Sequence, residues 1–249
     1  MRNHYSYRDF SEPRLASIYD HTRFGDAVGH WVQELEFDIV DRRFDFKGKS
    51  VLDVGAGTGR MSIFLAERGA KVIGLDASLE MLNILRKKII NRNLNIDMKL
   101  GDAHNIPFPA KYFDYVVSFM TMMHVADWKR VLSEMCRVAK GCIILQFPSK
   151  ASYACLSPLV QPMRKIFNEN AQKWHAFFVD DIEKILQKDG FSVLWSRKEL
   201  ALPVMVHRLL NNLTFSKKIE SYLCKMQITS LIGTPVLLMA ARKESSSES

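Results

Sequence analysis

Short apolar runs alternate with segments of helical periodicity between residues 50 and 147, and this alternation limits the possible folds more than any other feature of the chain. Neighbouring parallel strands need a long crossover connection, which is usually a helix. The pattern therefore predicts an α/β fold with a Rossmann-like, doubly wound sheet. The strands predicted in this part of the chain are residues 50–54, 71–75, 96–100, 115–119 and 142–147.

Residues that commonly start or end helices lie between these runs. Ser78 and Asp127 each precede a segment of helical periodicity, and their side-chain oxygens can accept hydrogen bonds from the first turn of a helix. Gly69 and Gly141 follow such segments, and glycine readily adopts the left-handed conformation in which many helices end. We therefore predict helices that begin at Ser78 and Asp127 and helices that end at Gly69 and Gly141.

The flanks predict further helices and strands. We expect residues 1–49 to form an N-terminal helical cap of one or two helices. We expect residues 50–243 to form the α/β domain, with a sixth strand at residues 190–195 and a final strand at residues 235–241.

Two segments of this domain, residues 149–175 and 204–226, are longer than ordinary connections between strands and helices. We expect them to be helical insertions that form a lid over the binding site. The tail at residues 244–249 is polar and low in complexity, which predicts disorder.

Cysteine spacing and hydropathy argue against several classes of protein. The four cysteines form no C-x-x-C pair and have no spacing with histidine that suits zinc, so the sequence predicts no metal site. No apolar stretch reaches the roughly 18 residues of a membrane-spanning helix, and the first residues lack the apolar core of a signal peptide. We therefore expect a soluble, cytoplasmic protein.

The formal net charge of +8 is compatible with an anionic partner such as nucleic acid. The basic residues are spread along the chain, however, and the densest cluster, Arg86, Lys87 and Lys88, falls on the predicted solvent face of a helix. This distribution favours an ordinary solvated surface over a nucleic-acid-binding patch. The sequence leaves the oligomeric state open.

A glycine-rich run, DVGAGTG at residues 53–59, joins the first predicted strand to the next helix. Glycines at such a turn let the backbone approach a ligand, which in open α/β sheets lies beyond the carboxyl ends of the strands. The spacing is not the G-x-G-x-x-G of dinucleotide-binding proteins, because Gly59 comes one residue early and Arg60 takes the expected position. The carboxylate of Asp53 would repel a pyrophosphate but suits a cationic ligand.

Two more aspartates lie at the ends of predicted strands. Asp76 ends the second strand, where a carboxylate can accept hydrogen bonds from both hydroxyls of an adenosine ribose. Asp102 follows the third strand and is placed to reach an adenine amino group. Each aspartate alone could equally be a helix cap or part of a solvated turn. Together with Asp53 and the glycine run, they predict a site for an adenosine-containing ligand.

Four motifs follow one another along the chain: VLDVGAGTG at residues 51–59, GLDAS at 74–78, GDAHNIPFP at 101–109 and FDYVVS at 113–118. In their order and spacing they resemble the motifs of class I S-adenosylmethionine-dependent methyltransferases. The chain most resembles the subgroup of ubiquinone and menaquinone biosynthesis methyltransferases, which implies a seven-stranded sheet with an antiparallel last strand. One departure is AKGC at residues 139–142, where the family usually has a proline and two glycines, and we expect a reshaped turn remote from the cofactor.

The resemblance implies that S-adenosyl-L-methionine is the cofactor. The glycine run would surround its methionine moiety, and Asp76 would hold the ribose. Ala77 and Met81 would lie against the adenine, while Asp102 and Ala103 would recognise its edge. With Phe119 as the floor, the implied cofactor-binding residues are Asp53, Gly55, Ala56, Gly57, Gly59, Asp76, Ala77, Met81, Asp102, Ala103 and Phe119.

The methyl acceptor is less directly encoded. Met120, Met122 and Met123 follow the fourth predicted strand at its carboxyl end, and adaptable methionine surfaces suit apolar ligands. The same side chains could instead form the core. We expect a small, partly apolar or aromatic acceptor. The alternatives are a methyltransferase that acts on tRNA or protein through its basic surface and a cofactor-binding scaffold without catalytic activity.

His124 is the candidate catalytic residue, because it follows the fourth strand where the methyl group and the acceptor should meet. An imidazole with an ordinary pKa near 6.5 can remove a proton from a hydroxyl, enol or amine as the methyl group arrives. The alternative is that His124 packs beneath the helix that begins at Asp127. Tyr19, His21 and His175 are further candidates whose positions the sequence does not define.

Overall fold

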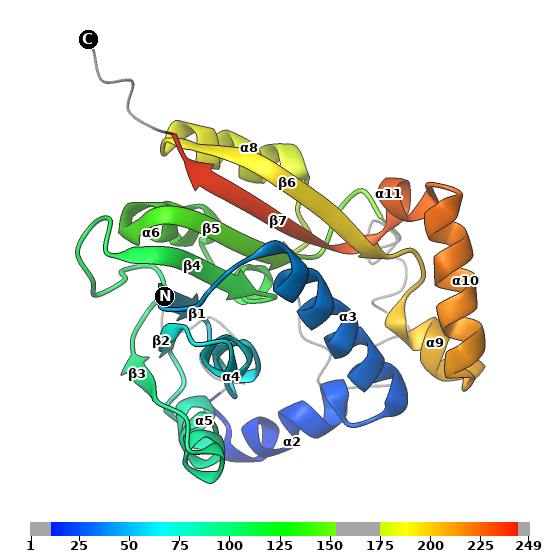
Figure 1. The fold of residues 1–249 in the computed structure, drawn as a ribbon, viewed down its shortest axis with the longest axis horizontal. Coiled ribbons are helices and arrows are strands. Elements are labelled where there is room, and N and C mark those ends of the chain that lie inside the picture. The colour runs from blue at the N-terminus through cyan, green and yellow to red at the C-terminus, as the bar shows by residue number, and fades with distance from the viewer. Residues whose placement is uncertain (1–10, 153–174, 244–249) are drawn as a thin grey trace.

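The computed structural model describes residues 11–152 and 175–243, and its centre is a seven-stranded sheet (Figure 1). The strands are β1 (Ser50–Val54), β2 (Lys71–Asp76), β3 (Ile96–Leu100), β4 (Phe113–Phe119), β5 (Ala139–Phe147), β6 (Phe191–Leu200) and β7 (Thr234–Arg242). Their order in the sheet is β3-β2-β1-β4-β5-β7-β6. Only β7 runs antiparallel to its neighbours. The predicted doubly wound sheet with an antiparallel last strand is confirmed.

Helices cover both faces of this sheet. They are α2 (Pro13–Phe24), α3 (Ala27–Arg43), α4 (Arg60–Glu67), α5 (Leu79–Arg92), the 3-10 helix η1 (Met122–His124), α6 (Trp128–Val138), α8 (Val179–Lys188), α9 (Val204–Leu210), α10 (Leu213–Lys225) and α11 (Ile228–Ile232). Leu52 and Val116 point toward α6 and α8, whereas Val51 and Val117 point toward α3, α4 and α5. Successive residues of a strand face opposite sides, so strands covered on both faces are apolar almost throughout.

The helix termini agree with three of the four predictions. Ser78 Oγ accepts from the Met81 N–H at 3.1 Å, Asp127 Oδ1 accepts from the Arg130 N–H at 3.1 Å, and Gly69 follows α4 with a φ of +80°. The prediction for Gly141 is wrong. Helix α6 already ends at Val138, and the chain passes directly into β5, so Gly141 is a strand residue. A Cβ at this position would lie 2.7 Å from the carbonyl oxygen of Asp114 on β4, so glycine permits the close strand contact.

The two predicted insertions differ in how far they can be followed. Residues 153–174 and the predicted tail at residues 244–249 lie outside the described residues. Residues 204–226 are largely helical and form α9 and α10, which are separated at Asn211 and Asn212. Asn211 has a φ of +45° and ends α9, and the side chain of Asn212 accepts from the Phe215 N–H at 3.0 Å to start α10.

Lys88 corrects the prediction of a solvent-exposed basic cluster. Arg86 and Lys87 are exposed, but Lys88 is half-buried. Its Nζ donates to the carbonyl oxygen of Thr58 at 2.9 Å and pairs with the carboxylate of Asp20, which also accepts from Thr58 Oγ1 at 2.6 Å. This cluster holds α2 over the loop that follows β1.

A buried chain of polar side chains joins α3 to the sheet. The Arg60 guanidinium donates to Glu36 Oε1 at 2.7 Å. Gln146 on β5 donates through Nε2 to Glu36 Oε2 and to Glu199 Oε1 on β6, both at 2.8 Å. Burial, together with the negative charge of Glu36, raises the pKa of Glu199 from 4.5 to about 8. Glu199 is therefore protonated in the folded protein near neutral pH.

The raised pKa of Glu199 predicts a stability that falls as the pH rises. Between the ordinary pKa of 4.5 and the folded value of about 8, the folded state keeps a proton that the unfolded state has lost. Stability is full below this window and decreases through it. Glu199→Gln removes the titrating group, so chemical denaturation from about pH 6 to about pH 9 should reveal a smaller loss of unfolding free energy than in the wild type.

Glu34→Gln is the matched control, because Glu34 is an exposed glutamate on the same helix as Glu36. It should follow the wild-type pH profile. An unchanged pH profile in Glu199→Gln would contradict the buried protonated glutamate.

Candidate functional site

A pocket opens at the carboxyl edge of the central strands. Its walls are the loop after β1, the end of β2, the loop after β3, the end of β4 with η1, and one side of α2. Every cofactor-binding residue implied by the sequence lines this pocket except Gly59 and Asp102. The motifs thus converge on one cavity, although they are spread over about 70 residues of the chain.

Two glycines of the loop are required by close contacts as well as by backbone conformation. Gly55 and Gly59 have φ angles of +76° and +86°. A Cβ on Gly55 would lie 2.2 Å from the side chain of Thr121, and one on Gly59 would lie 2.1 Å from Leu85 Cδ1. Gly59 therefore lets α5 approach the loop from behind, which explains why it supports the pocket without lining it.

Asp76 joins the glycine loop to the start of α5. Its Oδ2 accepts from the Gly57 N–H and its Oδ1 from the Ser78 N–H, both at 2.8 Å. Burial raises the pKa of Asp76, and these backbone donors act against that effect. A carboxylate offers about four acceptor positions, so both oxygens of Asp76 can accept further hydrogen bonds from a ligand in the pocket.

Asp53 provides the second carboxylate of the pocket. Its side chain is buried and accepts from Ser62 Oγ at 2.6 Å. Burial raises the pKa of Asp53 to about 6, while the hydrogen bond from Ser62 and the positive charge of Arg60 act in the opposite direction. A cationic ligand beside Asp53 would stabilise the ionised carboxylate and be attracted by it.

The carboxylate of Asp102 turns toward its own loop. Its Oδ1 lies 2.6 Å from His104 Nδ1 and accepts from the His104 N–H at 2.8 Å. The Asp127 N–H donates to His104 Nε2 at 3.2 Å, so the ring proton lies on Nδ1 and is donated to Asp102. Gly101 and Ala103, on either side of Asp102, line the pocket instead.

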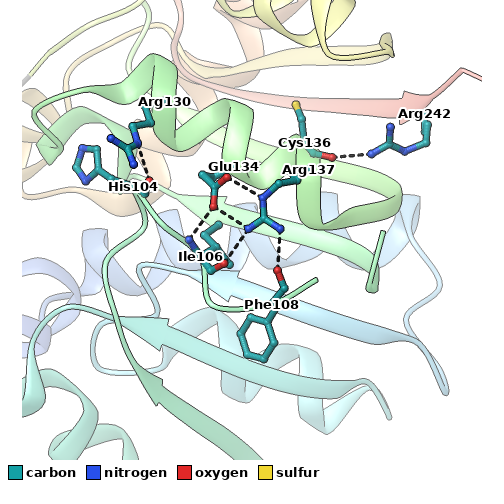
Figure 2. Close-up of polar contacts among 8 residues, drawn as sticks. All are labelled: His104, Ile106, Phe108, Arg130, Glu134, Cys136, Arg137 and Arg242. Carbon is teal, nitrogen blue, oxygen red and sulfur yellow. Dashed lines mark hydrogen bonds and ion pairs between the residues drawn. The ribbon is translucent and has the colours of Figure 1, made fainter. Parts of the chain in front are cut away.

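Side chains of helix α6 bind the backbone of this loop (Figure 2). Glu134 accepts from the Ile106 N–H at 2.8 Å, and Arg137 donates to the carbonyl oxygens of Ile106 and Phe108 at 2.8 and 2.7 Å. Arg130 donates to the carbonyl oxygen of His104 at 2.8 Å. These charged side chains replace the regular backbone pairing that a loop lacks, so the wall formed by Gly101 and Ala103 has a defined position.

His124 and Met120 line the side of the pocket beyond β4, where the sequence predicted the acceptor. His124 is 8% exposed. Met120 has a φ of +57°, which is uncommon for a residue with a side chain and occurs often at functional sites. Met122 and Met123 are buried in the core on the α6 side, so for them the core interpretation holds.

Of the three other candidate bases, one lies at the pocket and two do not. Tyr19 lines the pocket from α2, whereas His21 and His175 do not. His21 lines a second cavity, among α2, α3, α4 and α5, and the His175 N–H donates to the carbonyl oxygen of Met123 at 3.0 Å.

The sequence motifs missed several residues of the pocket wall. Arg23 and Phe24 enter it from α2, Arg60 from the start of α4, and Thr121 from the loop after β4. The Arg60 guanidinium lies 4.8 Å from the centre of the Phe24 ring. Arg60 directly follows the glycine run, and this position in the sequence could have indicated that it lines the pocket. The contribution of α2 depends on contacts between distant parts of the chain, and no local pattern indicated it.

Within the described ranges, no three His, Cys, Asp or Glu side chains gather in a way that could hold a metal ion. In the same part of the chain, no helix combines the length and the apolar character needed to cross a membrane.

Comparison with known proteins agrees with this architecture. A family model described as a methyltransferase domain matches residues 51–141. The chain is 39% identical over 129 residues to a demethylmenaquinone methyltransferase of Geobacillus sp. (strain WCH70), covering 49% of this chain and 55% of the relative. The chain therefore spans about half the length of this curated relative. The predicted resemblance to methyltransferases of this subgroup is confirmed.

Solved structures with the same fold extend over nearly the whole chain. A magnesium protoporphyrin IX methyltransferase from Synechocystis PCC 6803 with SAH bound has a TM-score of 0.66 and 18% sequence identity, and covers 96% of this chain and 98% of its own. The cyclase SpnF has a TM-score of 0.63 and 17% identity, and covers 94% of this chain and 97% of its own. At these identities the likeness establishes the fold alone, and the names of the two proteins refer to different reactions.

The contact between Gly59 and Leu85 predicts a strong effect of Gly59→Ala. The added methyl group would collide with Leu85 in addition to straining the backbone, so the melting temperature should fall well below that of the wild type. Gly48→Ala is the matched control, because Gly48 has a φ of +72° and no atom lies within 4 Å of the position that a methyl group would take there. Its free energy of unfolding should fall by only about 1–2 kcal/mol, the cost of a residue with a Cβ in the left-handed conformation. Equal losses in the two variants, measured by thermal denaturation, would rule out the collision.

Proposed function

We propose that this protein transfers the methyl group of S-adenosyl-L-methionine to a small, partly apolar acceptor. The convergence of Asp53, Asp76 and the glycine loop on one pocket is the observation that carries the proposal. The pocket wall also contains the guanidinium groups of Arg23 and Arg60, but a cationic sulfonium with an α-amino group suits a position beside Asp53 and Asp76, where a pyrophosphate would be repelled. The proposed setting for this reaction is the cytoplasm.

Asp76 and Asp53 divide the recognition of the cofactor between them. The two oxygens of Asp76 would accept hydrogen bonds from the ribose hydroxyls while they keep the backbone donors of Gly57 and Ser78. Asp53 would stabilise the positively charged methionine end. The loop that contains Gly101 and Ala103 would border the adenine.

The bound cofactor supplies a methyl group on a positively charged sulfur, which a nucleophile can displace in line. The residues of this chain then have two tasks, which are to align the acceptor with that methyl group and to exclude water. Met120 and Phe119 at the end of β4, with Tyr19 and Phe24 on α2, form a wall that suits an apolar acceptor. The names of the relatives, demethylmenaquinone and magnesium protoporphyrin IX methyltransferases, agree with an acceptor of this kind.

Calorimetry with purified protein tests the cofactor. S-adenosylmethionine and its demethylated product should both bind, and NAD should not, because Gly59 and Asp53 do not suit a pyrophosphate. Binding of NAD without a response to either adenosyl ligand would overturn the proposal. Transfer of tritium from labelled cofactor into a metabolite extract, divided into small-molecule and macromolecular fractions, tests the acceptor. Label confined to the RNA or protein fraction would favour a macromolecular acceptor.

Asp76→Ala should weaken cofactor binding by about 1.5–3 kcal/mol, because it removes a charged hydrogen-bond acceptor. From sequence alone, Asp76→Asn should weaken cofactor binding less than Asp76→Ala, because the amide oxygen can still accept a hydrogen bond. The structure changes this expectation, because one asparagine position is an NH₂ group that would meet the backbone N–H of Gly57 or Ser78. Calorimetry should therefore give similar losses for both variants. Wild-type affinity in Asp76→Ala would mean that the ribose lies elsewhere.

His124→Gln tests proton removal from the acceptor. A general base contributes about 10²–10⁴-fold to the rate, so turnover should fall by that amount while cofactor affinity stays unchanged. Cofactor affinity is measured by calorimetry and turnover with the identified acceptor. A loss below about tenfold would assign His124 a packing role.

A further inference from the structure

Exposed apolar side chains concentrate on the three helices between β6 and β7. Of the large apolar residues that are exposed in the described part of the chain, more than half lie between Met205 and Ile232. Leu209 on α9 is 79% exposed, Tyr222 on α10 is 60% exposed, and Leu231 on α11 is 69% exposed. Exposed apolar residues that cluster in this way usually mark a surface that contacts another apolar phase or partner.

Helix α10 has a regular arrangement of these side chains. Phe215, Tyr222 and the C-cap residue Met226 recur at spacings of seven and four residues, which places them along one flank of the helix and its end. Lys218 and Lys225 follow Phe215 and Tyr222 by three residues and therefore lie beside that flank. All five side chains are exposed. We call these five residues the basic–apolar face of α10.

The exposed charges of this region are exclusively positive. Residues 204–232 contain one carboxylate, Glu220, and it is buried. Glu220 accepts from the backbone N–H groups of Ala201 and Leu202 at 2.9 and 2.8 Å and lies 3.1 Å from His207 Nε2. It is therefore used to attach α10 to α9, and it does not neutralise the lysines on the outer surface.

The topology places this region at the same edge of the sheet as the pocket. Strands β5 and β6 are both antiparallel to β7, so β6 ends at the same edge of the sheet as the parallel strands. Helices α9, α10 and α11 leave from that edge and lie at one end of the molecule (Figure 1). The pocket opens at the same edge.

We propose that α9, α10 and α11 dock onto the surface of a lipid bilayer that contains anionic phospholipids. An interfacial helix inserts its apolar side chains below the headgroups, while lysines beside them pair with the phosphates. A second copy of this chain fits less well, because a two-fold contact would bring the lysines of both copies together. Nucleic acid would use the lysines but leave the exposed leucine and methionine side chains in water. The surface does not depend on the proposed methyl transfer.

Vesicle sedimentation tests the proposal with the full chain. Two kinds of vesicle are compared, phosphatidylcholine alone and phosphatidylcholine with about one third phosphatidylglycerol. The protein should sediment with the anionic vesicles and remain in solution with the neutral ones, and added salt should weaken the binding. Absence of binding to the anionic vesicles would overturn the proposal.

Matched variants separate this surface from general charge. Lys218→Glu/Lys225→Glu should lower the partition coefficient for anionic vesicles by at least about tenfold. Arg86→Glu/Lys87→Glu changes the net charge by the same amount on the exposed side of α5 and should stay within about twofold of the wild type. Phe215→Ser/Met226→Ser keeps all charges and should also lower binding by about tenfold. All variants should retain the wild-type circular dichroism spectrum.

Three results would contradict the proposed docking. Equal losses in the α5 and α10 charge variants would mean that binding reflects net charge alone. Wild-type binding in Phe215→Ser/Met226→Ser would exclude insertion of the apolar face. Dimerisation or tRNA binding that depends on these residues, without vesicle binding, would assign the face to a second copy or to nucleic acid.

Discussion

The two backbone hydrogen bonds accepted by Asp76 are the interaction on which the site depends. They connect the N–H of Gly57, in the loop after β1, with the N–H of Ser78, at the start of α5. The N–H groups of Gly55 and Ala56 donate to the carbonyl oxygen of Leu75, and the Asp76 carboxylate accepts from the Gly57 N–H, so the end of β2 satisfies three successive N–H groups of the loop. The same carboxylate faces the pocket. One side chain therefore sets the shape of the loop and presents a charge to the ligand.

A second set of contacts brings the N-terminal helices to the same place. Asp20 binds Thr58 and Lys88, which holds α2 over the glycine loop. Arg208 on α9 donates to Asp26 at 2.7 Å and to the carbonyl oxygen of Arg23 at 3.0 Å. Helix α2 is therefore held from the pocket side and from α9, and the pocket wall is mechanically connected to the helices that carry the basic–apolar face.

The fold by itself leaves the reaction open. A cyclase and a methyltransferase share this architecture with the chain at similar TM-scores, because the sheet only brings a pocket to its carboxyl edge. In this protein, the residues that distinguish the pocket come from α2, from the end of β4 and from Arg60. Arg60 is in turn fixed by Glu36, which connects through Gln146 to Glu199 on β6. This part of the pocket wall thus rests on a buried polar network with an unusual charge state.

The sequence by itself determined the strands, the glycine loop and the positions of Asp53 and Asp76, because each depends on residues that are close in the chain. Periodicity of apolar residues and turn chemistry act over a few residues, so they can be recognised without a structure. Only the tertiary structure decided that the Asp127 N–H reaches the His104 ring, that Met122 is core, and that α2 closes the pocket. These outcomes depend on contacts between segments distant in sequence, for which local patterns carry no information, and on which face of each element becomes buried when the sheet forms.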